Sequence, residues 1–431
     1  MYLTAKIHIS QGSHGSEYCT ALRMLCYHAA RMYNVGLYSV RQHYFDTDKY
    51  LSYYENYHLC KTNENYHLVL TDAGQQILRI VDRDMKSFFT LLTLKKNGKY
   101  SDDVKLPRYK DKDRLTSYAV QARSVRIHGN KARIGLSKNL REKYGFAYRY
   151  MEFTIPKNVD AQSIKEVRII PCFNGTEFDV EFIHNRKEAE ASMSNGVLSI
   201  DPGVSNLLTC TAFSNGKPDA FIIDGRRIKS INCYYNKALA RLKGIYAKDP
   251  KVQGTTARMR RLINGRKSRL DACFNSIAKY ITDYCLANGI GTVVIGYNKR
   301  QKQEMDMRKE NNQNFAYIPF YKLRRKLMNR CTLCGIKYES QEESYTSKAS
   351  ALSLDEIPTY GDKDIPEFSG YRKTRGTYKV KGMDGAVINA DVNGSINIYR
   401  KYLKCKSNAD LSADDVRAFV NRPVMRVSAL R

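Results

Sequence analysis

The segment VLSIDPGVSN, residues 197–206, constrains the fold more than any other part of the chain. Its first four residues are the short apolar run of a buried strand, and Asp201 follows where a Pro-Gly turn begins. LLTCTAF and then DAFIIDG continue the strand pattern. A buried strand that delivers a carboxylate, followed by two more strands, predicts an α/β domain with Asp201 at a strand end. Taken alone, an Asp at this place is equally often a turn or cap residue.

A second acidic residue lies far along the chain, in AVINADVNGSINIYRKYL. Asp391 comes near the start of an expected helix, ahead of an apolar face formed by Ile396, Ile398, Tyr399 and Leu403. The helix dipole favours an acid there, and such an acid can also face a metal or simply cap the helix. Between the two segments, TVVIGYN indicates a short buried strand over residues 292–295, and GIKYESQEESYTS indicates another that ends in acidic residues.

The charge of the chain narrows its class of partner. Lys and Arg outnumber Asp and Glu by 72 to 43 over 431 residues, a formal net charge of +29, and such a field attracts polyanions. Nucleic acid is therefore the expected partner. There is no long apolar run and no Trp, so we do not expect membrane binding. The start, MYLTAKIHISQG, has no apolar stretch of signal-peptide length, which predicts a reducing, cytoplasmic compartment.

Only one pair among the eleven cysteines has the spacing of metal ligands. Cys331 and Cys334 form a CxxC, but no partner pair follows them. The surrounding LRRKLMNRCTLCGI reads as an amphipathic helix that ends at Gly335, which makes both cysteines packing residues. We therefore do not expect zinc here.

The first 190 residues alternate between strand and helix patterns. Residues 3–9 predict a strand, residues 16–94 predict helices, and short strands with turns resume from about residue 124. These strands suggest a small barrel that residues 3–9 would complete. The aromatic and basic residues of the helical unit suit stacking and phosphate contacts, although each single aromatic is better explained as helical core. The polar stretch NRKEAEASMSNG predicts a domain boundary near residue 190.

Six segments, with a seventh in support, carry a resemblance to a known family. They are SIDPGVSN, VVIGYNKRQKQEMDM, NNQNFAYIPF, EESYTSKAS, SGYRKTRGTYKV and INADVNGSINIYRK, supported by LPRYKDKD. Through them the chain resembles the TnpB family of transposon-associated, RNA-guided nucleases, relatives of the type V CRISPR effectors. The likeness is strongest over residues 196–404. It implies an RNase H-like (RuvC) nuclease domain and an N-terminal wedge barrel interrupted by a helical recognition unit. The implied parts are a first wedge strand (1–12), the helical recognition domain (13–110), the rest of the wedge (111–190), RuvC (191–345) with a helical insertion (226–290), a target-nucleic-acid-binding insert (346–385), the RuvC C-terminal part (386–405) and a tail (406–431).

The resemblance also implies a metal centre. In that family three carboxylates hold two Mg²⁺ ions that hydrolyse phosphodiesters. Asp201 matches the first carboxylate and Asp391 the third, but Gly296 stands where the second, a Glu, is usual. Because adjacent strands lie about 4.8 Å apart, we expect Glu343 on the neighbouring strand to fill that space. The alternative is loss of the second ligand and of cutting.

Two other glutamates suit that role less well. Glu342 should point to the opposite face if the strand stays regular, and Glu304 lies in a polar loop. The acidic pair Glu342 and Glu343 can also be read as a solvated strand edge.

Basic residues gather in two places. A helical hairpin broken near residues 249–254 has a strongly basic second arm, and the insert, which lacks the zinc-ribbon cysteines usual in the family, keeps three basic residues near two tyrosines. We expect phosphate contacts there, although a solvated helix face explains each residue equally well. The residues are Arg258, Arg260, Arg261, Arg266, Lys267, Arg269, Arg372, Lys373 and Arg375.

These observations predict a prokaryotic, RNA-guided DNA endonuclease that uses two Mg²⁺ ions. Its expected partners are a guide RNA and a DNA target, double-stranded and single-stranded, and we expect a monomer. Two alternatives stay open: a nuclease-inactive, RNA-guided repressor, and a transposition-associated protein without a cleavage role of its own.

Overall fold

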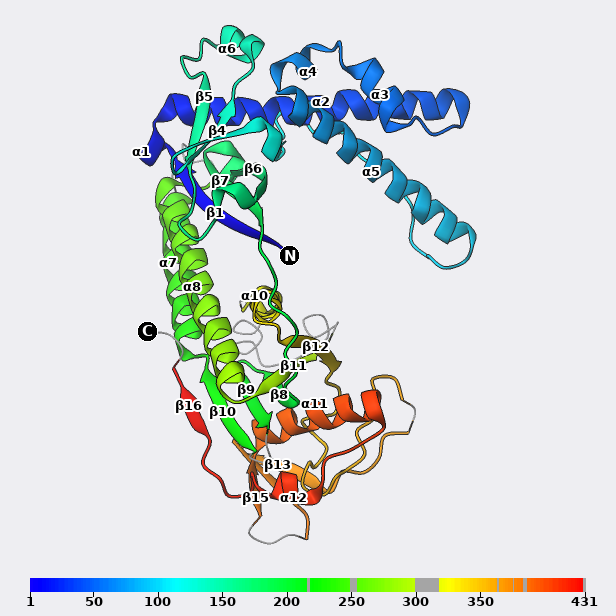
Figure 1. Cartoon of the computed structure of the whole chain (residues 1–431), viewed down its shortest axis with the longest axis vertical. Coiled ribbons are helices and arrows are strands. Elements are labelled where there is room, and N and C mark those ends of the chain that lie inside the picture. Colours follow the sequence, from blue (N-terminus) through cyan, green and yellow to red (C-terminus); the bar gives the residue numbers. More distant parts are fainter. Residues whose placement is uncertain are drawn as a thin grey trace. The chain divides into compact units, whose positions relative to one another are not determined.

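The chain divides into two compact units, residues 1–187 and 188–431, and each is described by itself. The structure is a computed structural model, and it describes residues 1–214, 218–248, 254–298, 318–362, 364–374, 376–382 and 386–428. Figure 1 labels the helices and strands of both units.

Helices dominate the first part of unit 1, as predicted for residues 16–94. The two long ones, α2 and α5, pack on each other through residues such as Leu37 and Val81. The start of α3 has a capping box, in which Ser52 and Glu55 satisfy each other's backbone N–H groups. The helices are α1 (Gln11–His14), α2 (Ser16–Thr47), α3 (Tyr53–Cys60), α4 (Glu64–Leu68), α5 (Thr71–Lys96) and α6 (Lys138–Tyr144).

The strands of unit 1 form two sheets. The larger has the order β1-β7-β6-β2, so that the first strand of the chain pairs antiparallel with the last strand of the unit; the smaller has the order β3-β4-β5. The predicted strands are therefore present, but the two separate sheets do not confirm a closed barrel. The strands are β1 (Tyr2–Ser10), β2 (Tyr118–Gln121), β3 (Val125–His128), β4 (Lys131–Gly135), β5 (Tyr150–Thr154), β6 (Ile164–Cys172) and β7 (Glu177–Asn185).

Unit 2 is built on a six-stranded sheet with the order β12-β11-β8-β9-β10-β16. Strands β8, β9 and β10 run antiparallel in turn, while β11 is parallel to β8, β12 to β11 and β16 to β10. Three antiparallel strands extended by parallel ones agree with the predicted RNase H-like sheet. The strands are β8 (Gly196–Pro202), β9 (Asn206–Phe213), β10 (Asp219–Asp224), β11 (Ile290–Tyr297), β12 (Lys337–Glu342) and, in a tail that gave no signal in the sequence, β16 (Met425–Val427).

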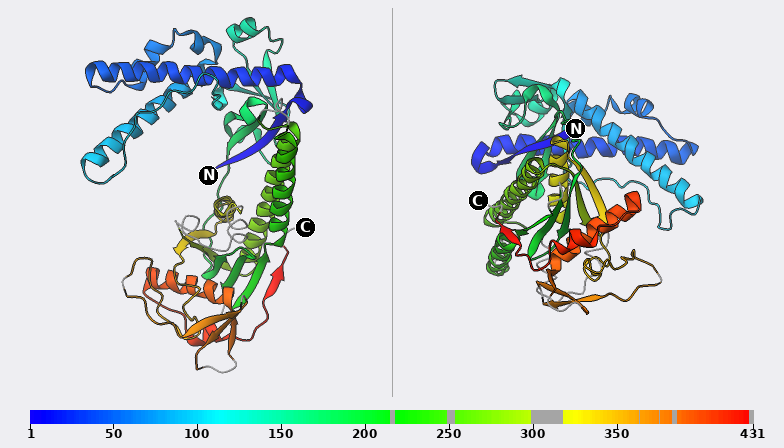
Figure 2. Two further views of the ribbon diagram at one scale, coloured as in Figure 1. Left: turned by 180° about the vertical axis from the view of Figure 1, so that it is seen from behind. Right: turned by 60° about the horizontal axis from the view of Figure 1, so that its bottom comes forward.

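Helices pack on this sheet according to the alternation of its side chains. Leu198 and Ile200 of β8 belong to the core formed with α8 and α10, whereas Val197 and Ser199 contact α11. Asp201, two residues after Ser199, therefore lies on the same side of the sheet as α11. Figure 2 shows α11, the red-orange helix, beside the strands of this sheet. The helices are α7 (Arg226–Tyr246), α8 (Ala257–Ala287), α10 (Phe320–Leu333), α11 (Ala390–Ser407) and α12 (Ala413–Arg417).

A second, three-stranded sheet precedes α11. It has the order β13-β14-β15, formed by β13 (Gly370–Thr374), β14 (Thr377–Val380) and β15 (Val387–Asn389), and β15 runs directly into the helix. The two motif cysteines lie at the end of α10, with Cys331 buried, as the amphipathic pattern predicts. Within the described ranges, no helix is long and apolar enough to cross a membrane.

Candidate active site

Asp201 stands at the end of β8 against the first turns of α11. A Cβ atom on Gly394 would lie 2.7 Å from Oδ2 of Asp201, so only glycine at position 394 allows this approach. Burial raises the pKa of Asp201 well above its usual value, and the charges of Glu343 and Asp391 raise it further, while Arg372 opposes them. The other two predicted carboxylates, Glu343 and Asp391, therefore both act electrostatically on Asp201.

Glu343 fills the space that Gly296 leaves open. A Cβ atom on Gly296 would lie 2.5 Å from Oε2 of Glu343 and 2.8 Å from Cδ1 of Ile398, both closer than real Cβ atoms approach, and 3.4 Å from Cβ of Glu343. β12 ends at Glu342, so the side chain of Glu343 reaches back from the first residue after the strand. Burial raises the pKa of Glu343 to about 7; Arg324 lowers it and Glu342 raises it. The placement expected from the sequence is present, while a catalytic role for Glu343 stays a prediction.

Asp391 is held by side chains from two other segments. Asn206 at the start of β9 donates its side-chain N–H to Oδ2 over 2.6 Å, and the guanidinium of Arg372 on β13 pairs with Oδ1. The helix cap is Asn389, whose Oδ1 accepts the backbone N–H groups of Asp391 and Val392. Asp391 is thus not the capping residue, and its carboxylate is held by Asn206 and Arg372.

Buried polar contacts fix α11 on the sheet at the depth of these carboxylates. Ser199 donates to the backbone carbonyl of Ser395 over 2.6 Å, and Ser395 donates back to the carbonyl of Ser199 over 3.0 Å. On another side of the helix, Asn393 donates to the carbonyl of Ala349 and accepts from the N–H of Ala351. Satisfied buried polar pairs specify one packing arrangement, so the register of Gly394 opposite Asp201 is set by its neighbours.

The other two glutamates considered from the sequence do not reach this position. Glu342 accepts a hydrogen bond from the backbone N–H of Ser344 over 2.7 Å, and its carboxylate pairs with the buried Lys401 of α11 over 2.5 Å. These contacts lower its pKa against the effect of burial. Glu304 lies outside the described residues.

In this structure the three carboxylates are not arranged as a metal-binding group. Within the described ranges, no set of three or more His, Cys, Asp or Glu side chains is placed to hold a metal ion. One cause is visible at Asp391, because the pairing with Arg372 and Asn206 turns its oxygens towards those donors. The chemistry of the donors still suits Mg²⁺, which prefers carboxylate oxygens.

Asn206 and Arg324 are site residues that the sequence did not single out. Asn206 joins two segments, since its Oδ1 accepts from Arg426 of β16 over 2.8 Å while its amide group holds Asp391. Arg324 of α10 stacks over the ring of Tyr297 at 4.0 Å and lowers the pKa of Glu343. The Asn of the DPGVSN segment was the only available signal, because it follows Asp201 by five residues.

The predicted basic residues fall in two separate groups. Six belong to the first half of α8, and two belong to β13, where Lys373 is exposed and Arg372 contacts Asp391. Arg372, predicted as a nucleic-acid contact, thus has a partner inside the site. Arg375 lies outside the described residues. Whether any of the others binds nucleic acid stays a prediction.

Comparison with known proteins agrees with the arrangement. A family model described as a probable transposase matches residues 178–302, and a model of the Cas12f1-like TNB domain matches residues 320–398. The TnpB-like protein ORF457 of Acidianus two-tailed virus is 23% identical over 411 residues, which cover 88% of this chain and 83% of that protein.

A solved structure shares the fold. The Cas12f1 chain in its complex with single-guide RNA and target DNA matches with a TM-score of 0.52 and 14% identity, over 90% of this chain and 84% of that one. This likeness establishes the fold and extends through both units. The two family models and the viral relative support a TnpB-family protein, in agreement with the resemblance read from the sequence.

Proposed function

We propose that this protein is an RNA-guided DNA endonuclease that binds a guide RNA, recognises a short motif beside its target and cleaves DNA by two-metal hydrolysis. The observation that carries the proposal is the position of Glu343. Its carboxylate occupies the place opened by Gly296 and acts electrostatically on Asp201, which restores an acidic group where the strand itself provides none.

Asp201, Glu343 and Asp391 would hold the metal ions. Burial raises the pKa of Asp201 and the charges of Glu343 and Asp391 raise it further, so a divalent cation bound at this place would offset the repulsion on Asp201. Bound Mg²⁺ supplies an activated water and stabilises the leaving oxygen during phosphodiester hydrolysis.

The residues of the chain itself position the reacting groups. Asn206 orients Asp391 through a 2.6 Å hydrogen bond, and Gly394 lets Asp201 approach the helix. Arg372 carries the positive charge nearest to Asp391 and is well placed to move to a phosphate of the DNA strand. Its departure would free Oδ1 of Asp391.

Guide RNA and target DNA are the proposed partners. The net charge of +29 supports binding to polyanions, and base pairing with the guide would supply sequence choice while the protein contributes charge and shape. We assign the proposed wedge to residues 1–12 and 111–190, the recognition helices to 13–110, RuvC to 191–345 and 386–405 with its insertion at 226–290, the target-binding insert to 346–385, and a tail to 406–431.

The test uses the protein purified with the RNA that accompanies it. That RNA is sequenced, a DNA target complementary to its variable end is supplied with Mg²⁺, and cleavage is measured for the wild type and for Asp201→Asn. We expect the wild type to cut and Asp201→Asn to lose cutting by about a thousandfold or more while it retains the RNA. Equal cutting by both proteins would exclude the assignment of Asp201.

A nuclease-inactive, RNA-guided repressor is the second candidate. It is favoured by one observation, the pairing of Arg372 with Asp391, which occupies a carboxylate that the metal ions need. A wild type that binds guide and target tightly but never cuts, with any divalent cation, would establish this candidate in place of the first.

A further inference from the structure

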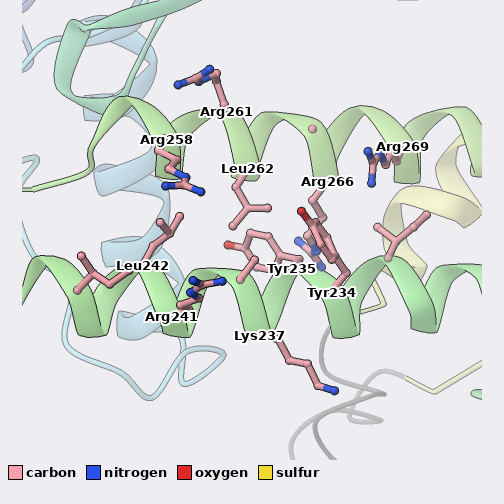
Figure 3. A pocket seen from close by; sticks show the side chains of 14 residues that line it. Tyr234, Tyr235, Lys237, Arg241, Leu242, Arg258, Arg261, Leu262, Arg266 and Arg269 are labelled. Carbon is pink, nitrogen blue, oxygen red and sulfur yellow. The ribbon is translucent and has the colours of Figure 1, made fainter.

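A groove of about 640 Å³ lies between α7 and α8 (Figure 3), and none of the three carboxylates lines it. Both helices contribute side chains to it. The residues that line it are Ile231, Tyr234, Tyr235, Lys237, Ala238, Arg241, Leu242, Ile245, Arg258, Arg261, Leu262, Gly265, Arg266 and Arg269.

The lining is basic and has no acidic member. It contains one lysine and five arginines but no Asp or Glu. The sequence has no acidic residue anywhere in Arg226–Tyr246 or from Ala257 to Leu270; the first is Asp271, which pairs with Lys322 of α10. The groove therefore attracts an anion, and no carboxylate of its own lining competes for the arginines.

The floor of the groove is apolar and aromatic, which simple phosphate binding does not require. Tyr234 is 61% exposed and Ile245 is 53% exposed. In Figure 3 the side chain of Leu262 points from α8 towards Tyr235 of α7, while Arg261 points outwards at the rim. Large apolar groups left in contact with solvent among so many charges indicate a surface that a flat, uncharged ligand group covers.

One of the tyrosines is already held in place. The guanidinium of Arg266 lies over the ring of Tyr235 at 4.8 Å, and its Nε donates to Oδ1 of Asn232 over 2.8 Å. This contact spans the two helices and fixes a ring beside the cations. A preorganised aromatic loses less conformational entropy when a ligand stacks on it.

We propose that this groove binds an unpaired nucleobase of a single-stranded nucleic acid, with Tyr234 and Tyr235 stacking on the base and the surrounding arginines contacting its phosphates. The proposal rests on the proposed function and deepens it, because it names a single-stranded segment of the bound RNA or DNA as the ligand. A duplex hides the faces of its bases and needs cations alone, whereas stacking platforms within a basic groove suit single strands.

The test measures binding of three labelled eight-nucleotide strands to the full-length protein without Mg²⁺: oligouridine, oligodeoxythymidine and an abasic strand of equal charge. We expect the wild type to bind at least one base-containing strand about 5- to 100-fold more tightly than the abasic strand. Tyr234→Ala combined with Tyr235→Ala should remove that preference, and the two Phe variants should keep it. A preference for uridine or for thymidine identifies the source of the strand as RNA or DNA.

Controls separate the groove from other binding surfaces. Tyr321→Ala removes a tyrosine of α10 that is 76% exposed and should leave the preference unchanged. Arg258→Gln and Arg269→Gln should weaken the binding of all three strands alike. Each should also reduce the slope of the logarithm of the binding constant against the logarithm of the salt concentration by about 0.7 per lost phosphate contact. A 5-iodouridine strand should crosslink to Tyr234 or Tyr235.

Two results would overturn the proposal: a folded double Tyr→Ala protein that keeps the full preference for bases, or crosslinks that map only outside α7 and α8. Neither readout depends on cutting. A protein that never cleaves DNA but shows the base preference would refute the endonuclease while the groove stands, and the reverse pattern would refute the groove alone.

Discussion

The carboxylate of Glu343 lies where a side chain on Gly296 would have to be, with 2.5 Å between Oε2 and the position of a Cβ atom. Gly296 lies on β11, where it pairs with Gln341 of the parallel strand β12, and Glu343 is the first residue after β12. A side chain at position 296 would therefore force the carboxylate of Glu343 and the Cδ1 end of Ile398 to shift. Because β11 carries a glycine at this position, it leaves room for the carboxylate of Glu343, which follows β12.

The close approach of Glu343 to position 296 predicts the outcome of exchanging the two residues. Gly296→Ala should displace the carboxylate of Glu343. It should reduce Mg²⁺-dependent cleavage nearly as strongly as Glu343→Ala, by about a hundredfold or more, because both variants lose a carboxylate ligand of the metal ions. Gly296→Glu combined with Glu343→Gly returns one carboxylate to the same space. We expect the double variant to cut faster than either Gly296→Ala or Glu343→Ala, measured as the single-turnover rate on a guide-matched target.

Two controls distinguish ligand loss from misfolding. If only a metal ligand is lost, each variant should retain its guide RNA and the wild-type circular dichroism spectrum. If Gly296→Ala cuts like the wild type, the packing of Glu343 against residue 296 does not matter for catalysis and the arrangement would have to be reinterpreted.

Gly394 makes a second prediction about close approach. Gly394→Ala places a Cβ atom 2.7 Å from Oδ2 of Asp201 and should lower the free energy of unfolding by about 1–3 kcal/mol. The matched control is Gly244→Ala in α7, where a Cβ atom meets nothing within 4 Å. Because alanine favours helix more than glycine does, the control should stabilise the protein by about 0.5–1 kcal/mol. Thermal melts of the two variants should therefore shift in opposite directions.

Much of the site was predictable because its parts are local. The apolar run before Asp201 specifies a strand end, and the apolar face after Asp391 specifies a helix start nearby. The cap of this helix was not predicted, since it is Asn389 and not Asp391. The position of Glu343 followed from the spacing of neighbouring strands and from the gap at Gly296. The alternation rule used to separate Glu342 from Glu343 applies only as far as Glu342, because β12 ends there.

What the sequence did not reveal depends on contacts between distant segments. Nothing near Asn206 indicates that its amide group holds Asp391, 185 residues away, or that Arg426 binds the same side chain. The charge of Arg372 and the tyrosines near it predict a contact with nucleic acid, whereas its pairing with Asp391 depends on the fold of β13. Likewise, two sheets in unit 1 rather than one closed barrel are a matter of long-range pairing that strand patterns do not specify.

The ion pair of Arg372 and Asp391 predicts a competition with metal ions. Arg372→Gln removes the guanidinium from Oδ1 of Asp391 and should raise the affinity for Mn²⁺ or Mg²⁺ by about tenfold, as judged by the metal concentration that half-maximally raises the melting temperature. The same variant should cut more slowly at saturating metal if Arg372 moves to a phosphate. Lys373→Gln, on the same strand and exposed, is the matched control for metal affinity and should leave that affinity unchanged. An unchanged metal affinity in Arg372→Gln would show that the ion pair does not compete.

The raised pKa of Glu343 predicts how the stability of the metal-free protein depends on pH. The carboxyl group has a pKa near 4.5 when unfolded and about 7 when folded, so between these values the folded state binds more protons than the unfolded state. Stability must then fall as the pH rises through this window, by at most about 3 kcal/mol for this group. Glu343→Gln preserves the shape without the charge, and its melting temperature should exceed that of the wild type at pH 8 by more than at pH 5. The exposed Glu142→Gln controls for the loss of one negative charge and should show no such trend.

Saturating Mg²⁺ should make the wild type melt at a higher temperature than Glu343→Gln at pH 8, because the cation needs the ionised carboxylate that Gln cannot provide. A difference between Glu343→Gln and the wild type that stays constant from pH 5 to pH 8 would mean that Glu343 is ionised throughout and that burial does not govern its charge.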